Sequence, residues 1–139
     1  MRKHRTEIQL RFSDCDMLQH VNNAKYPTFM EVARVQYVND VVEPFRSWDE
    51  TGIMLAAYTM DFKIPVYYTD KLFVDTYITS IGTKSFKMEY DFVVETDTGE
   101  IIKAHGTTVM VYYHYKNLQT LPVPALWREM INKYHNTNF

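Results

Sequence analysis

One helical segment, from about Asn22 to about Val42, precedes a chain that otherwise alternates polar and apolar residues. At about 100° per residue, a single apolar stripe runs along this segment, formed by Tyr26, Met30, Ala33, Tyr37 and Val41. The helix is expected to begin with an irregular turn at Pro27 and to end before Pro44, with a connection over Arg46 to Gly52. Alternation then predicts four strands, over residues 53–64, 71–81, 85–96 and 100–115. One long helix followed by antiparallel strands predicts a two-layer α+β domain.

The clearest predicted strand covers residues 85–96, where alternate residues are apolar: Phe86, Met88, Tyr90, Phe92 and Val94. Gly82 and the run from Asp97 to Gly99 supply hairpin turns on either side. In the last strand, one face carries small residues on which the helix can lie closely: Ala104, Gly106 and Thr108. Its other face is apolar and suggests an oligomer contact: Val109, Val111 and Tyr113. A first strand is predicted over Glu7–Phe12, and a short C-terminal helix around Leu126–Tyr134.

Composition narrows the class of protein. The chain has 139 residues and is 46% hydrophobic, so we expect one domain, 1–139, with a substantial core. A net charge of −2 does not suggest binding to nucleic acid or to an anionic membrane. The single cysteine, Cys15, excludes an intramolecular disulfide and fits a reducing compartment. Because we also recognise neither a signal core nor a membrane span, we expect a soluble cytoplasmic protein.

A polar motif stands immediately before the helix. It reads Phe12-x-Asp14-x-Asp16, then His20-Val21-Asn22-Asn23-x-x-Tyr26, and continues into the helix as Glu31-x-x-Arg34. A helix N-terminus carries unpaired N–H groups and about half a positive charge, so it can polarise a carbonyl. A carboxylate a few residues upstream can face that carbonyl. The motif therefore predicts an acid combined with an oxyanion hole.

This motif resembles that of the hotdog-fold acyl-CoA thioesterases of the 4-hydroxybenzoyl-CoA thioesterase type. Further similar signatures lie at Phe62-Lys63-Ile64-Pro65, Ile81-Gly82-Thr83-Lys84-Ser85-Phe86 and Ala104-His105-Gly106. The resemblance implies a five-stranded antiparallel sheet, in the order 1-3-4-5-2, wrapped around the helix. It also implies that the strand after the helix pairs with its copy in a second subunit, giving a homodimer or homotetramer. The implied reaction hydrolyses an acyl-CoA to a free acid and coenzyme A without a metal or cofactor, coenzyme A being part of the substrate.

The resemblance makes Asp16 the catalytic acid, acting as a nucleophile or as a general base on water. The alternative is a loop carboxylate that fixes a turn. Asp14 would share a face with Asp16 in an extended segment, where like charges raise one pKa, although we expect it mainly to hold the loop together. Cys15 would then point away from both acids and is interpreted as structural.

Two further positions are implied to be functional. Asn23 aligns with the residue whose backbone N–H polarises the thioester carbonyl, while Asn22-Asn23 can also simply cap the helix. His20 matches a catalytic histidine of the related acyl-carrier-protein thioesterases. Those enzymes place an asparagine two residues after the acid, where this chain has Leu18, so we expect His20 to orient the loop. Gln19 stands where many acyl-CoA members carry glycine.

Charged residues outside the motif have two interpretations. Glu31 and Arg34 face the apolar side of the helical wheel and are expected to pair with each other. Basic residues on the late strands could contact coenzyme A phosphates, Lys84 and Lys87 above all, or could simply line a solvated sheet. For the whole protein, two other functions stay open: an acyl-carrier-protein thioesterase and a non-catalytic domain that binds acyl thioesters.

Overall fold

The computed structural model describes residues 1–42 and 50–139. The connection expected over Arg46 to Gly52 lies mostly outside these residues. The strands are β1 (His4–Ile8), β2 (Thr51–Phe62), β3 (Lys71–Ile81), β4 (Ser85–Thr96), β5 (Gly99–His114) and β6 (Gln119–Thr120). The α-helices are α1 (Tyr26–Tyr37) and α2 (Ala125–His135). None of the helices in the described residues is long and apolar enough to cross a membrane.

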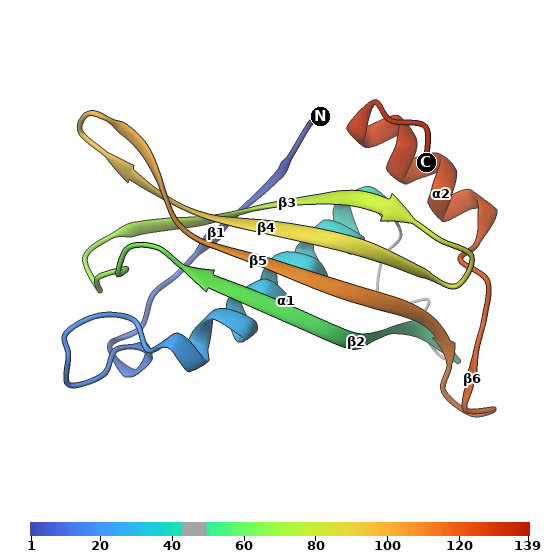
Figure 1. Cartoon of the computed structure of the whole chain (residues 1–139), viewed down its shortest axis with the longest axis horizontal. Helices are drawn as coiled ribbons and strands as arrows, with labels where there is room; N and C mark the ends of the chain where they lie inside the picture. The colour runs from blue at the N-terminus through green and yellow to red at the C-terminus, as the bar shows by residue number, and fades with distance from the viewer. Residues whose placement is uncertain (43–49) are drawn as a thin grey trace.

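The strands form one antiparallel sheet in the order β1-β3-β4-β5-β2, and the short β6 pairs with β5. The predicted order is confirmed, and β3 and β4 have the predicted bounds. Consecutive hairpins join β3 to β4 and β4 to β5 (Figure 1). β2, which precedes these strands in the chain, pairs with the side of β5 that β4 leaves open. This order leaves β1 and β2 at the two edges of the sheet.

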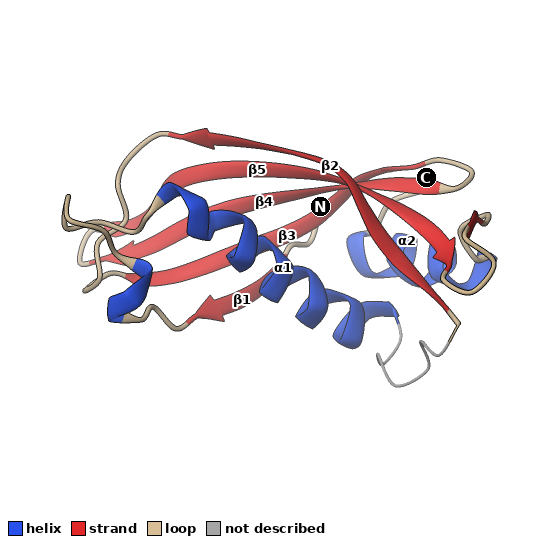
Figure 2. Cartoon of the chain, turned by 90° about the horizontal axis from the view of Figure 1, so that it is seen from below, coloured by secondary structure: helices blue, strands red, loops and turns tan. Residues whose placement is uncertain are grey.

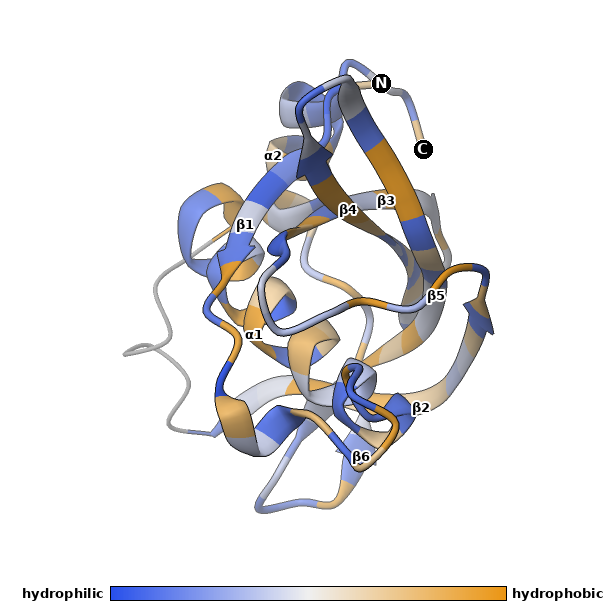
Figure 3. Ribbon diagram, turned by 90° about the vertical axis from the view of Figure 1, so that its left-hand side faces the viewer, coloured by the Kyte–Doolittle hydropathy of each residue, from blue (hydrophilic) through white to orange (hydrophobic). Residues whose placement is uncertain are grey.

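Helix α1 lies across the concave face of the curled sheet, which is the hotdog arrangement (Figures 2 and 3). The predicted apolar stripe is confirmed, since all five of its members are buried: Tyr26, Met30, Ala33, Tyr37 and Val41. At the start of the helix, the ring of Tyr26 packs against Phe62 and Phe92 with centroid distances of 5.0 Å each. The helix therefore supplies the central apolar layer on which the sheet closes.

The face of small residues that was predicted for the last strand lies directly beneath α1. A Cβ atom at Gly106 would stand 2.5 Å from Met30 Sδ and 2.8 Å from Met60 Sδ. Any larger residue at this position would therefore force both methionine side chains to shift. The buried Ala104 and Thr108 continue this face on either side.

The predicted helix over 22–42 is divided into three parts. A 3-10 turn over Asn23–Lys25 precedes α1, and a π-helical turn over Val38–Val42 follows it. Pro27 lies in the first turn of α1, where its missing N–H costs least. The irregular first turn expected from Pro27 is thus confirmed, and it leaves the α-helix itself shorter than predicted.

The first strand was predicted too late in the chain. β1 covers His4–Ile8 and turns His4, Thr6 and Ile8 inward, whereas Phe12 begins a 3-10 turn and is 82% exposed. His4 and Thr6 point inward although they are polar, so the alternation of apolar residues did not reveal this strand. His4 is accommodated because its Nε2 lies 2.9 Å from Asp40 Oδ2 at the end of the helical segment. β2 and β5 also differ from their predicted bounds, by one or two residues at each end.

The predicted pair of Glu31 and Arg34 is wrong. Glu31 is exposed, and within the described residues no ion pair joins it to Arg34. Arg34 is 8% exposed, and its positive charge acts on the hydroxyl of Tyr90 on β4. The helical wheel placed Arg34 correctly on the buried side but misplaced Glu31, which lies on the exposed part of α1 together with Val32 and Val35.

The predicted C-terminal helix is confirmed as α2, which packs against the end of α1 and the N-terminal segment. His135 is fully buried, its Nδ1 lying 2.6 Å from Arg2 O and its Nε2 2.8 Å from Tyr37 Oη. A carbonyl only accepts, so Nδ1 carries the proton and Tyr37 donates to Nε2. Burial lowers the pKa of His135.

Candidate active site

The polar motif before α1 folds into a closed loop over residues 14–22. Asn22 N donates to Asp14 O at 2.8 Å, Asp16 N donates to His20 O at 3.1 Å, and Cys15 bridges Val21. The loop is attached to the body of the protein where Val21 N donates to Val66 O at 2.7 Å, just before β3. Asp16 and the helix start are therefore held in one short backbone ring.

Asp16 is half-buried at the tip of this ring. Its Oδ1 accepts from Leu18 N at 2.9 Å, so the turn-fixing role considered from the sequence is present. Within the described residues its Oδ2 accepts no hydrogen bond. Asp16 lines a hollow of about 600 Å³ together with Phe12, Cys15, Met17, Gln19 and Tyr68. One carboxylate oxygen thus stays available beside a largely apolar hollow.

Two aromatic residues of this hollow were not anticipated. Phe12 and Tyr68 pack edge to face with a centroid distance of 6.2 Å. Phe12 precedes the acid by four residues, whereas Tyr68 comes from the segment between β2 and β3. Their pairing depends on long-range packing. In the sequence, the only signal is that Phe12 is an apolar residue shortly before the acid.

Asp14 is separated from Asp16, contrary to the shared face expected in an extended chain. It is 0% exposed and accepts from Arg11 N at 2.8 Å and Arg11 Nη2 at 3.1 Å, with Lys25 Nζ at 4.0 Å. Burial opposes its ionisation, but the hydrogen bonds and charge of Arg11, with the charge of Lys25, hold the pKa of Asp14 below its usual range. The expectation that Asp14 holds the loop together is confirmed.

Cys15 does not point away from Asp16, because it lines the same hollow. The 3-10 turn over Phe12–Asp14 replaces the extended chain on which that expectation rested. Burial, with the negative charges of Asp14 and Asp16, raises the pKa of the Cys15 thiol. The thiol therefore stays protonated and is a poor nucleophile.

His20 and Asn23 line a second, smaller hollow of about 250 Å³. Its other walls are Val21, Tyr26, Phe62, Lys63, Ile64 and Pro65. The side chain of Asn22, not Asn23, caps the helical segment by accepting from Ala24 N at 2.9 Å. Within the described residues nothing accepts a hydrogen bond from Asn23 N–H. The predicted capping and a free backbone donor are therefore both present.

The structure places Asp16 and His20 on one ring that Asn23 directly follows, but Asp16 does not share a hollow with His20 and Asn23 in a single chain. His20 is half-buried, and its Nδ1 lies 3.4 Å from Val21 O, a long contact that fits an orienting role. Asp16 lines the larger hollow, and His20 with Asn23 lines the smaller one.

Lys84 and Lys87 lie at the opposite end of β3 and β4 from this loop (Figure 1). Lys84 Nζ donates to Thr120 Oγ1 at 3.2 Å, and Lys87 Nζ lies 3.0 Å from Glu89 Oε1. Neither lines the hollows of Asp16 or Asn23 in the same chain. Of the two, Lys84 has the ammonium without a carboxylate partner in the described residues.

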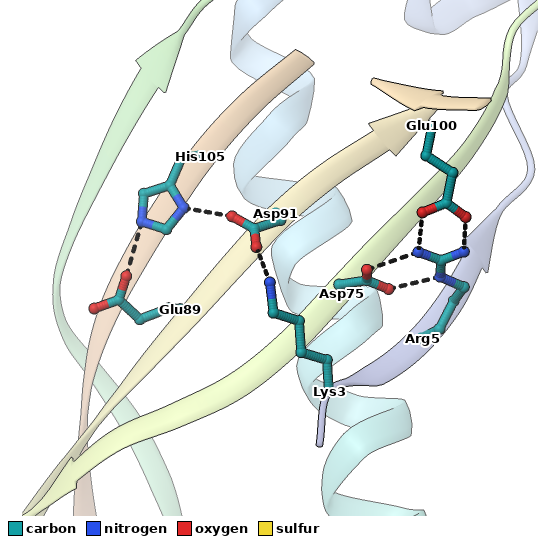
Figure 4. Close-up of polar contacts among 7 residues, drawn as sticks. All are labelled: Lys3, Arg5, Asp75, Glu89, Asp91, Glu100 and His105. Carbon is teal, nitrogen blue, oxygen red and sulfur yellow. Dashed lines mark hydrogen bonds and ion pairs between the residues drawn. The ribbon is translucent and has the colours of Figure 1, made fainter. Parts of the chain in front are cut away.

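Lys87 belongs to a charge network on the outer face of the sheet. The ring of His105 stands between Glu89 and Asp91, with each nitrogen 2.8 Å from a carboxylate oxygen (Figure 4). Lys3 Nζ reaches Asp91 Oδ2 at 2.6 Å. Nearby, Arg5 bonds both Asp75 and Glu100. Each of these carboxylates has a basic partner. The described residues contain no group of His, Cys, Asp or Glu arranged to hold a metal ion.

Comparison with known proteins agrees with this fold. Residues 10–131 match the family model described as the thioesterase-like superfamily. The chain is 25% identical over 114 residues to YneP of Bacillus subtilis (strain 168), an inferred acyl-CoA thioesterase, covering 80% of this chain and 81% of that one.

Solved structures show the same architecture. A variant of 4-hydroxybenzoyl-CoA thioesterase in complex with 4-hydroxybenzoyl-CoA superposes with a TM-score of 0.86 at 20% identity, over 94% of this chain and 99% of that one. A thioesterase from Thermus thermophilus, complexed with coenzyme A and zinc, superposes with a TM-score of 0.83 at 27% identity, over 97% and 96%. The chain is therefore a member of the thioesterase-like superfamily and has the hotdog fold.

Proposed function

We propose that this protein hydrolyses acyl-CoA thioesters, with Asp16 as the reacting acid and the backbone N–H of Asn23 as the oxyanion donor. The observation that carries the proposal is the closed loop over residues 14–22, which holds Asp16 and ends directly before Asn23. Asp16 has a carboxylate oxygen free of hydrogen bonds from the described residues, and Asn23 has a free N–H at a helical N-terminus. These are the two groups that thioester hydrolysis needs.

In the base route, Asp16 takes a proton from water as the water oxygen bonds to the thioester carbonyl carbon. Asn23 N–H, aided by the helix dipole, stabilises the negative charge that develops on the carbonyl oxygen. The C–S bond then breaks, and the proton passes from Asp16 to the departing thiolate. In the nucleophile route, Asp16 displaces coenzyme A directly and forms an anhydride that water hydrolyses. Neither route calls for a metal or cofactor, so we expect full activity in the presence of a chelator.

A second copy of the chain would complete this site. β2 is an edge strand, and residues 54–59 are exposed along it, including Met54, Leu55 and Tyr58. A long apolar edge is a liability unless another strand pairs with it. An antiparallel β2–β2 pair would extend the sheet across a two-fold axis and cover the neighbouring hollows.

This pairing also supports the coenzyme A contact expected for Lys84 and Lys87. Antiparallel β2 strands place the Asp16 end of one sheet beside the far end of the other, where the hairpin between β3 and β4 lies. Lys84 of the partner subunit would then face the phosphates of a substrate bound at Asp16. Lys87 contributes less, because Glu89 already neutralises it.

The test is a panel of acyl-CoA and acyl-carrier-protein thioesters, with released thiol measured by a thiol reagent. Turnover of acyl-CoA substrates supports the proposal, and a preference for acyl-carrier substrates would favour the related alternative. Binding of acyl-CoA without release of thiol would identify a non-catalytic acyl-thioester domain. Single turnover in ¹⁸O-labelled water separates the two routes: the base route places one labelled oxygen in the acid, whereas an acid without label, with the label in Asp16, shows that water hydrolysed an Asp16 anhydride.

A further inference from the structure

Gln19 has a backbone conformation that glycine adopts more easily. Its φ is +66°, in the left-handed region, where the Cβ of most residues is crowded. The conformation closes a tight turn, because Gln19 N donates to Asp16 O at 3.0 Å. A glycine would hold the same turn without strain. Strain that persists beside a reactive group points to a function for the side chain that causes it.

Three non-glycine residues among those described have positive φ: Gln19, Leu118 and Asn136. Asn136 ends α2, where a left-handed residue satisfies the helix terminus. Leu118 lies in the exposed turn between β5 and β6, at the sheet end far from the loop. Gln19 alone of the three lines the hollow of Asp16.

The side chain of Gln19 has the chemistry to contact a substrate there. Its carboxamide offers two N–H donors and an acceptor, whereas Phe12, Met17 and Tyr68 supply mainly apolar surface to the hollow. Within the described residues no hydrogen bond occupies this carboxamide. An apolar hollow with a few polar groups is the usual form of a site that orients a small ligand.

We propose that Gln19 is a substrate-contacting residue, whose carboxamide hydrogen-bonds a polar group close to the thioester carbonyl. This inference rests on the proposed thioesterase function. The polar group is an amide or hydroxyl, present either in the pantetheine arm or in the acyl chain. The strained turn keeps a side chain at this point of the hollow, where glycine would supply none.

The experiment compares Gln19→Gly, Gln19→Ala and Gln19→Asn with the wild type, using butyryl-CoA and 3-hydroxybutyryl-CoA. Gln19→Gly should lower kcat/KM by about three- to tenfold, the value of one neutral hydrogen bond, while raising Tm by roughly 1–4 °C. Gln19→Ala should lose the same activity and keep the strain. Gln19→Asn, which keeps the amide and tolerates the turn, should recover part of the activity.

Leu118→Gly is the matched control. It removes a comparable backbone strain from the turn between β5 and β6, which lines neither the Asp16 hollow nor the Asn23 hollow of its own chain, so its Tm should rise while its kcat/KM stays unchanged. A loss confined to 3-hydroxybutyryl-CoA assigns the contact to the acyl chain, and an equal loss with both substrates assigns it to pantetheine. Unchanged kcat/KM in Gln19→Gly, or no recovery in Gln19→Asn, would overturn the inference.

A binding measurement separates this inference from the proposed function. A non-hydrolysable thioether analogue of 3-hydroxybutyryl-CoA, which carries both the pantetheine amides and an acyl hydroxyl, is titrated into the wild type and Gln19→Gly by calorimetry. Suppose that the wild type releases no thiol, but that Gln19→Gly binds the analogue more weakly than Leu118→Gly does. The Gln19 contact is then supported and the hydrolytic function is contradicted. If the wild type turns over and neither kcat/KM nor binding changes in Gln19→Gly, the contact falls and the function stands.

Discussion

The backbone N–H of Asp16 donates a 3.1 Å hydrogen bond to the carbonyl oxygen of His20, across the ring that leads into α1. This bond joins the two residues through their backbones, while the Asp16 side chain lines the larger hollow and His20 lines the smaller one with Asn23. The position of the acid is therefore set by the backbone, and substitutions of its side chain can test its chemistry separately from the fold.

Replacing Asp16 with asparagine should lower kcat by about 10²–10⁴-fold, the usual contribution of a positioned general base. Asparagine keeps the Oδ1 that accepts from Leu18 N, so Tm should change little. Both quantities are measured on the same purified variant. Asp70→Asn is the control, because Asp70 also accepts a backbone N–H, from Tyr67 at 2.9 Å, but lies outside the Asp16 hollow. Full kcat with a lowered Tm would leave Asp16 only its role in the turn.

Replacing Leu55 with lysine should dissociate the protein, because it places a charge on the apolar edge of β2. Analytical ultracentrifugation should show a dimer or larger assembly for the wild type, and a monomer or unfolded chain for the variant. Leu126→Lys introduces the same charge at an exposed position on α2 and should keep the assembly. A folded and active wild-type monomer at low concentration would contradict the expected pairing.

Replacing Gly106 with alanine should destabilise the protein by about 1–3 kcal/mol, the usual cost of overpacking a core. The added Cβ would collide with Met30 Sδ and Met60 Sδ. Urea denaturation measures the change. At Gly82, where a Cβ would lie 3.4 Å from Ser85 O, alanine meets only a tight backbone contact and should cost less. Equal effects at the two glycines would show that the methionines move aside freely.

Acidification should weaken the fold through His135. Burial lowers its pKa below the ordinary value of 6.5, so the unfolded chain takes up this proton first. The stabilisation is complete above pH 6.5 and is lost as the pH falls from there toward the lower folded pKa. His135→Gln keeps a donor for Arg2 O and an acceptor for Tyr37 Oη but does not titrate. The free energy of unfolding of the wild type should therefore fall more steeply between pH 7 and pH 5 than that of the variant, and parallel curves would exclude this role.

Local patterns were sufficient for the elements with regular periodicity. The alternation of residues 71–81 and 85–96 predicted β3 and β4 with their observed bounds, and the stripe from Tyr26 to Val41 predicted the buried face of the helical segment. These predictions succeeded because periodicity determines which side chains share a face. The motif from Phe12 to Arg34 likewise identified the loop that holds Asp16, His20 and Asn23.

Long-range packing decided the rest. Only the fold shows that β1 begins at His4, that Arg34 reaches Tyr90 rather than Glu31, and that Tyr68 joins Phe12 beside Asp16. It also separates Asp14 from Asp16, because the 3-10 turn before Cys15 buries one carboxylate and presents the other. Each of these depends on contacts between residues far apart in the chain, or on a turn whose geometry the surrounding packing selects. A sequence pattern indicates which side chains share a face and how far apart they lie. Which side chains are buried, and which residues they contact, is decided only when the sheet closes around the helix.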